Sequence, residues 1–108
     1  MSDARDLEQV RTDIDAIDQE IQLLLNRRAQ CAQRVAEIKQ AEAHARGDRG
    51  EDVIYYRPER EAQVLERIIA RNTGPLDGST VAHIFREVMS ACLALEKPLR
   101  VAYLGPEG

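Results

Sequence analysis

The chain is poor in aromatic residues, which make up 4% of its 108 residues, and it has no tryptophan. Strands favour aromatic and β-branched side chains, so few aromatics make a β-sandwich or barrel a poor fit. A core of Leu, Ile, Val and Ala suits packed helices instead. With 44% hydrophobic and 31% charged residues, the composition is typical of one folded domain of ordinary size. We therefore predict an all-α fold.

Residues for covalent or metal chemistry are also scarce. Cys31 and Cys92 form no CxxC motif, and His44 and His83 are isolated. The sequence shows no Ser/His/Asp set, no metal-ligand spacing and no glycine-rich phosphate loop. We expect both cysteines to be small buried residues. We expect no metal ion, no cofactor and no covalent nucleophile.

The charge and hydropathy patterns narrow the class of partner. A net charge of −4 argues against a general nucleic-acid binder, although a local cluster of cations can still bind a small anion. No apolar run approaches the length of a bilayer span, and polar residues rather than a signal peptide follow Met1. The sequence predicts a cytosolic protein without nucleic-acid or membrane partners.

The longest regular feature covers residues 7–40, where apolar residues recur at every third and fourth position without Gly or Pro. The stripe consists of Leu7, Val10, Ile14, Ile17, Ile21, Leu24, Cys31, Val35 and Ile38. This spacing predicts one amphipathic helix over about 6–42, with Asp6 and Gln9 as a capping pair. At about 1.5 Å per residue, residues 7–40 span roughly 50 Å. A compact single domain cannot cover that length, so a second copy is the natural cover.

Two shorter helices are predicted at about 57–72 and 78–96. Glycines and charges indicate a loop over 43–53, and Pro58 suits the first turn of the second helix. Asp77 or Ser79 can cap the third helix. Residues 99–104 have the pattern of a β-strand. A lone strand has no partner, so we expect a domain at 1–97, with 98–108 as the linker and first strand of a truncated second domain.

One arginine, Arg28, interrupts the apolar stripe of the first helix. A guanidinium in an apolar seam is costly unless an anion meets it. Lys39 lies about three turns later on nearly the same face, roughly 16 Å away, so both can bind one small dianion. Arg11 lies roughly 25 Å from Arg28 and can join it only from an antiparallel second copy. Alternatively, Arg28 extends to solvent or pairs with a carboxylate, and Arg11 is a solvated surface charge.

The other two helices offer hydrogen-bonding groups near their apolar faces. Glu61 lies at the edge of the second helix's stripe beside Arg60, and Cys92 aligns with Glu96 on the third helix. For each carboxylate alone, pairing with a neighbouring Arg or Lys is the better explanation. Taken together, they outline a cationic site that can hold and polarise an anion and has no evident nucleophile.

The sequence resembles the all-helical, AroQ-class chorismate mutase domain that begins bifunctional chorismate mutase/prephenate dehydratases, over about residues 7–96. The matching segments are Leu7-x-x-Val10-Arg11-x-x-Ile14-x-x-Ile17-Asp18, Leu24-Leu25-Asn26-Arg27-Arg28, Val35-x-x-x-Lys39, Arg57-Pro58-Glu59-Arg60-Glu61 and Ile84-Phe85-Arg86-Glu87-Val88-Met89-Ser90. Residues 101–108 resemble the first strand and turn of the dehydratase domain. The resemblance implies an intertwined homodimer of three-helix chains with shared sites. It also implies the Claisen rearrangement of chorismate to prephenate, without a cofactor, in phenylalanine and tyrosine biosynthesis.

The resemblance also implies roles for individual residues. Arg28, with Arg11 of the partner subunit, matches the carboxylate-binding arginines. Lys39 matches the lysine that contacts a carboxylate and the ether oxygen. Glu61 matches the glutamate that binds the ring hydroxyl, and Arg60 is the arginine beside it.

Three positions depart from the family pattern. Cys92 stands where a serine assists carboxylate binding, so that contact is expected to be weak or lost. Arg57 aligns with an aspartate of some members and is given no role. Glu96 stands where many members have a glutamine that donates to the ether oxygen. Because an ionised carboxylate cannot donate a hydrogen bond, we predict that Glu96 acts in its protonated form and that the rate rises toward acid pH.

Two alternatives stay open at this point. The same helical fold serves isochorismate-pyruvate lyases, which act on a related substrate in a similar cationic pocket. The first helix also resembles a coiled-coil segment, so a non-catalytic dimerisation module is the second alternative. That reading leaves Arg28 in the seam unexplained.

Overall fold

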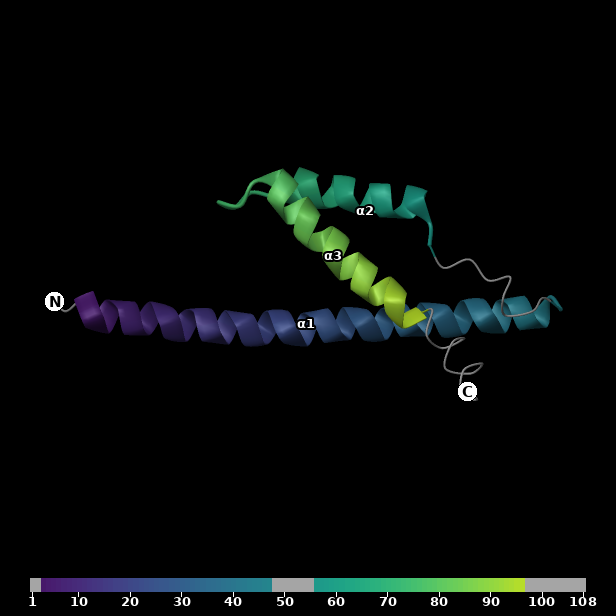
Figure 1. The fold of residues 1–108 in the computed structure, drawn as a ribbon, viewed down its shortest axis with the longest axis horizontal. Helices are drawn as coiled ribbons and strands as arrows, with labels where there is room; N and C mark the ends of the chain where they lie inside the picture. Colours follow the sequence, from purple (N-terminus) through teal and green to yellow (C-terminus); the bar gives the residue numbers. More distant parts are fainter. Residues whose placement is uncertain (1–2, 48–55, 97–108) are drawn as a thin grey trace, which may run out of the picture.

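The computed structural model describes residues 3–47 and 56–96, which form three helices (Figure 1). They are α1 (Asp3–Ala45), α2 (Pro58–Arg71) and α3 (Gly78–Glu96). The described residues contain no strand, which confirms the all-α prediction. The strand predicted at 99–104 and most of the loop predicted at 43–53 lie outside the described residues.

Helix α1 is longer at both ends than the predicted range of 6–42. Asp6 and Gln9 lie inside the helix, and the Gln9 amide Nε2 donates to Asp13 Oδ1 at 3.0 Å. The capping pair predicted at Asp6 is therefore wrong: no residue between Asp3 and Asp6 opposes a helix, so the helix starts earlier. It ends where Gly47 adopts a φ of +86°, a left-handed conformation that glycine adopts without strain.

Helix α2 begins at Pro58, whose missing N–H is no loss in a first helical turn. The preceding Arg57 has an extended backbone and makes no side-chain cap, although its carbonyl accepts the Glu61 N–H at 3.0 Å. The helix ends at Arg71, and Asn72 is extended. The predicted range of 57–72 was one residue too long at each end.

Helix α3 begins and ends where the sequence predicted. Asp77 is the capping residue: its Oδ1 accepts the Thr80 backbone N–H at 3.0 Å, and its Oδ2 accepts the Ser79 hydroxyl at 3.3 Å. These hydrogen bonds hold the Asp77 pKa below its usual value. Gly78 starts the helix close to Ile69 of α2: a β-carbon there would lie 3.2 Å from Ile69 Cγ2. The small residue therefore allows α2 and α3 to approach.

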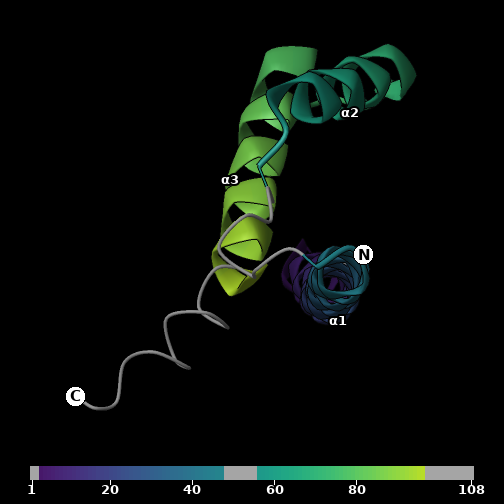
Figure 2. The ribbon, with the colours of Figure 1, turned by 90° about the vertical axis from the view of Figure 1, so that its right-hand side faces the viewer.

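Helix α3 connects the other two helices, because it packs against both α1 and α2. In Figure 2, which looks along α1, α3 descends from α2 to α1. The buried apolar residues are few: Ala36, Ala43, Leu65, Ile68, Ala82 and Cys92. Most of the α1 stripe remains exposed, with Ile17 at 52%. Cys31 is also exposed, so only one cysteine of this single chain is buried, contrary to the prediction.

The molecule is correspondingly elongated, with extents of 69 × 34 × 21 Å and a radius of gyration of 19.2 Å. A compact domain of this length has a radius of gyration of about 13 Å. The N-terminal half of α1 projects beyond α2 and α3 (Figure 1). Of the described helices, none is long and apolar enough to cross a membrane.

Candidate active site

A cavity of about 710 Å³ lies where the C-terminal half of α1, the start of α2 and the end of α3 meet. Four cationic residues, Arg28, Lys39, Arg57 and Arg60, line it. Glu61 and Glu96 are the carboxylates of the lining, and the remaining lining residues are Cys31, Ala32, Val35, Tyr56, Val64, Met89, Ser90, Cys92 and Leu93. The volume is in the range of small-molecule sites.

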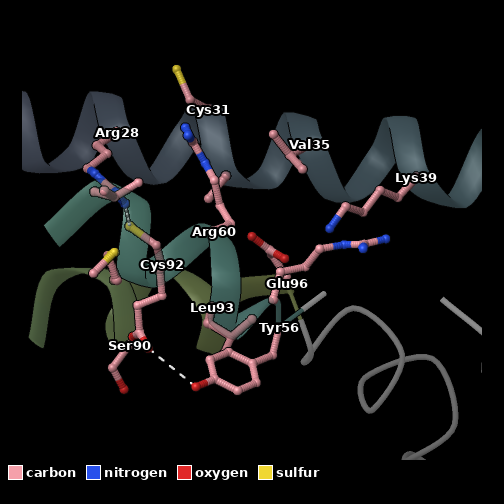
Figure 3. Close-up of a pocket in the computed structure, with 15 residues that line it drawn as sticks. Arg28, Cys31, Val35, Lys39, Tyr56, Arg60, Ser90, Cys92, Leu93 and Glu96 are labelled. Atoms are coloured by element: carbon pink, nitrogen blue, oxygen red, sulfur yellow. Dashed lines mark hydrogen bonds between the residues drawn. The ribbon is translucent and has the colours of Figure 1, made fainter. Parts of the chain in front are cut away.

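Helix α1 supplies two of these cations from one face. Arg28 and Lys39 are three turns apart and both line the cavity, as the helical spacing predicted (Figure 3). The Arg28 guanidinium donates from Nη1 to the Cys92 sulfur of α3 at 3.3 Å. A guanidinium has five N–H donors, so this contact orients Arg28 and leaves donors for a ligand.

Cys92 occupies the point where α3 touches α1, and its side chain is 6% exposed. Its thiol accepts a hydrogen bond from Arg28, and the same contact packs α3 against α1. Sulfur is a weak acceptor, so Arg28 is held less firmly here than by an oxygen.

Helix α2 contributes Arg60 and Glu61 from its first turn. Glu61 Oε1 accepts a hydrogen bond from the Tyr56 hydroxyl at 3.3 Å. The negative charge of Glu61, more than burial, raises the pKa of the Tyr56 phenol above its ordinary value. Tyr56 was not among the site residues predicted from the sequence. Its signal was the position five residues before Glu61, close enough to reach back over the helix start.

Glu96, at the last turn of α3, is 8% exposed. Its Oε1 is buried and has no hydrogen-bond partner among the described residues. Burial raises the pKa of this carboxyl, and the nearby positive charge of Lys39 opposes the shift only in part. Figure 3 shows Glu96 beneath α1, between Arg60 and Lys39. A buried carboxyl with an unused oxygen is suited to meet a ligand atom.

Six of the seven predicted site residues therefore surround one cavity: Arg28, Lys39, Arg60, Glu61, Cys92 and Glu96. Arg11 is the exception, since it does not line the cavity. It lies on the projecting half of α1, roughly 25 Å along the axis from Arg28. Within one chain, Arg11 cannot reach a ligand held by Arg28.

The arrangement is suited to bind a small anion by charge and to polarise it. Four cations face a cavity with one orienting carboxylate, Glu61, and one carboxyl whose ionisation is disfavoured, Glu96. Among the described residues, no cluster of three His, Cys, Asp or Glu side chains has the arrangement of a metal site. A cationic cavity of this kind favours reactions in which charge is redistributed within a bound anion.

Comparison with known proteins identifies the family. The model of the family "Chorismate mutase type II" matches residues 10–97. Two solved structures have the same fold: a chorismate mutase of Thermus thermophilus and one of Helicobacter pylori in complex with prephenate. Their TM-scores are 0.72 and 0.71, at 28% and 29% identity. The matches cover 84% and 85% of this chain, and 93% and 90% of those chains.

Curated relatives extend the match over the whole chain. The bifunctional chorismate mutase/prephenate dehydratase of Stutzerimonas stutzeri is 53% identical over all 108 residues. The Pseudomonas aeruginosa protein of the same name is 52% identical over the same length. The chain spans 28% of the length of each of these two relatives. With a three-helix fold, a cationic cavity and a family match over 10–97, the chain belongs to the type II chorismate mutase family.

Proposed function

We propose that residues 1–97 form a chorismate mutase domain, which converts chorismate to prephenate by a Claisen rearrangement. The observation that carries this proposal is the cavity shared by Arg28, Lys39, Arg60, Glu61 and Glu96. Family membership supports the reaction, and prephenate is the ligand in the Helicobacter pylori structure. The rearrangement is pericyclic: the ether C–O bond breaks as the new C–C bond forms in one step, so it needs neither a nucleophile nor a cofactor.

In this mechanism the cations hold the two carboxylates of chorismate. Arg28, held by Cys92, and Lys39 lie on the same face of α1 and bind the anion from one side of the cavity. Glu61 accepts a hydrogen bond from the ring hydroxyl, and Arg60 lies beside it. The contacts to the two carboxylates fix the compact conformer in which the two carbons that will bond are close, which lowers the entropic part of the barrier.

Negative charge builds on the ether oxygen as its C–O bond breaks. Lys39 and protonated Glu96 both donate toward that oxygen in the proposed arrangement. The raised pKa of Glu96 supports this role, because the neutral carboxyl is a donor and the ionised one is not. One preorganised donor of this kind typically contributes about 3–4 kcal/mol to transition-state stabilisation.

The complete site requires two chains. The exposed stripe on the projecting half of α1 comprises Leu7, Val10, Ile14, Ile17 and Ile21. An antiparallel second α1 that crosses near residue 20 covers this stripe. The crossing also places Arg11 of the partner subunit beside Arg28. We therefore include a homodimer with two shared sites in the proposal.

The whole protein is proposed to carry a second activity. The relatives that match this chain are named bifunctional chorismate mutase/prephenate dehydratases and extend well beyond it. Residues 98–108 then lead into a prephenate dehydratase domain. Prephenate formed by the first domain is the substrate of the second.

The test is a spectrophotometric assay of chorismate consumption by the wild-type protein and by Arg28→Ala. Replacement of Arg28 removes a charge-assisted contact to a carboxylate and is expected to lower kcat/KM by about 100-fold or more. Product analysis on chorismate and isochorismate separates the mutase from a lyase: prephenate supports the proposal, and pyruvate release contradicts it.

Arg28→Leu tests the alternative of a pure dimerisation module. Leucine completes the apolar stripe of α1, so a module without catalytic function gains thermal stability and loses nothing else. The proposal expects activity to fall by orders of magnitude in the same variant. Circular dichroism melting and the chorismate assay on one sample distinguish the two.

A further inference from the structure

We propose that Tyr56 is a positioning residue for Glu61: its hydroxyl holds one carboxylate oxygen, so that the other faces the ring hydroxyl of the bound substrate. This inference rests on the proposed function, since it assigns Glu61 to the ring hydroxyl. It adds a residue to which neither the sequence pattern nor the family resemblance gave a role. Tyr56 lines the cavity and lies at its lower edge in Figure 3.

Two hydrogen bonds link Glu61 to the residues just before α2. The Tyr56 hydroxyl donates to Glu61 Oε1 at 3.3 Å, and the Glu61 backbone N–H donates to the Arg57 carbonyl at 3.0 Å. The second bond fixes the main chain of Glu61, and the first restrains its side chain. A free glutamate side chain on a first helical turn samples several rotamers, and ordering it on substrate binding carries an entropic cost.

The chemistry of the Tyr56–Glu61 pair allows Glu61 to accept from Tyr56 and from the substrate at the same time. A carboxylate has two oxygens and about four acceptor sites, so one oxygen can accept from Tyr56 while the other accepts from the substrate. A phenol only donates to such a partner at neutral pH, and the Glu61 charge keeps it protonated. Tyr56 is 49% exposed, and its hydroxyl can be removed without removing the ring that packs against the fold.

Tyr56→Phe removes the hydroxyl and keeps the ring. If Glu61 binds the ring hydroxyl equally in the ground and transition states, loosening Glu61 raises KM and leaves kcat nearly unchanged. For an exposed hydrogen bond to a charged group, we expect KM for chorismate to rise about three- to tenfold. We expect kcat to stay within about twofold of wild type and the melting temperature to stay unchanged.

A double-mutant cycle with Glu61→Ala shows whether Tyr56 acts through Glu61. We expect the Tyr56→Phe effect on KM to vanish in the Glu61→Ala background. An unchanged KM in Tyr56→Phe, or the same effect in both backgrounds, overturns the inference. If wild type converts no chorismate, the proposed function fails instead.

A spectroscopic titration tests the contact without any substrate. The phenol of Tyr56 is identified by the difference between wild type and Tyr56→Phe in the ultraviolet titration of tyrosinate. We expect Glu61→Ala to lower the Tyr56 pKa toward its ordinary value, because the charge that raises it is removed. A Tyr56 pKa that does not respond to Glu61→Ala overturns the proposed pairing even if the enzyme is active.

Discussion

At the scale of single residues, Glu96 carries the sharpest chemical consequence. Its carboxyl is buried at the end of α3, and one oxygen has no partner among the described residues. Desolvation raises its pKa, and Lys39 counteracts only part of that shift. Burial thus disfavours the ionised form of Glu96, which is the form that cannot donate a hydrogen bond.

The pH dependence of the reaction follows from this protonation. As the pH rises above the Glu96 pKa, the protonated fraction falls, and kcat/KM is expected to fall by up to about tenfold per pH unit. Glu96→Gln keeps a donor at every pH and should flatten this limb of the profile. Rate measurements across about pH 5 to 8 test the prediction. An identical profile for wild type and Glu96→Gln contradicts it.

The folded state, like the reaction, is expected to be favoured when Glu96 is protonated. A carboxyl whose pKa is raised on folding stabilises the folded state below its unfolded-state pKa, and this contribution is lost as the pH rises through the folded-state pKa. Glu96→Gln should therefore melt above wild type at neutral pH, with the gap closing in acid. Melting curves at both pH values serve as the structural control for the rate measurements.

At the scale of elements, α3 is the helix on which the cavity depends, because it packs against both α1 and α2. Its C-terminal half brings Cys92 and Glu96 to α1, and its N-terminus is fixed by Asp77. A local feature far from the cavity thus determines where α3 starts and stabilises its first turn. Loss of that feature is expected to weaken the fold without changing the chemistry.

Asp77→Ala removes the cap and is expected to lower the melting temperature by a few degrees. Asp77→Asn, which can still accept the Thr80 N–H, should retain most of the stability. The Asp77 pKa is lowered by its hydrogen bonds, so its contribution is present above the unfolded-state pKa and is lost as the pH falls through the folded-state pKa. The acid sensitivity should be smaller in Asp77→Asn. A change of kcat in either variant would contradict the separation of cap and site.

At the scale of the whole molecule, the single chain leaves the apolar stripe of α1 exposed. The radius of gyration of 19.2 Å and the exposed stripe of α1 describe a molecule whose apolar surface is not covered by its own helices. Large contiguous apolar surfaces mark interaction sites. In the proposed homodimer, a twofold axis across α1 would bury the stripe and, by symmetry, make two equivalent sites.

Mixed dimers test the shared site directly. Arg11→Ala and Arg28→Ala chains are each expected to be nearly inactive alone. After unfolding and refolding of an equal mixture, about half of the dimers contain one chain of each kind. In those mixed dimers, one of the two sites combines the intact Arg28 of one chain with the intact Arg11 of the other, and the second site lacks both arginines. Half of the dimers with half of their sites restored should return about one quarter of wild-type activity. No recovery, with mixed dimers confirmed by mass spectrometry, contradicts the shared site.

The sequence by itself determined the three helices and six of the residues that line the cavity. The apolar spacing, Pro58 and Asp77 act over a few residues, so they are visible without a fold. The predicted range of α1 was too short because neither its first turn nor its last turn contains a residue that ends a helix. Gly47 is the first such residue after the helix. Arg28 could be identified from the sequence because a charged side chain within an apolar stripe is costly unless an anion pairs with it.

Only the tertiary structure decided which side chains meet. Spacing along α1 could not show that Cys92 lies 3.3 Å from Arg28, because that contact joins residues 64 positions apart. The burial of Glu96 and the exposure of Cys31 likewise depend on where α3 crosses α1. The Tyr56–Glu61 bond depends on how the chain enters α2. Desolvation and hydrogen bonding are set by neighbours in space, and these properties decide how the site works.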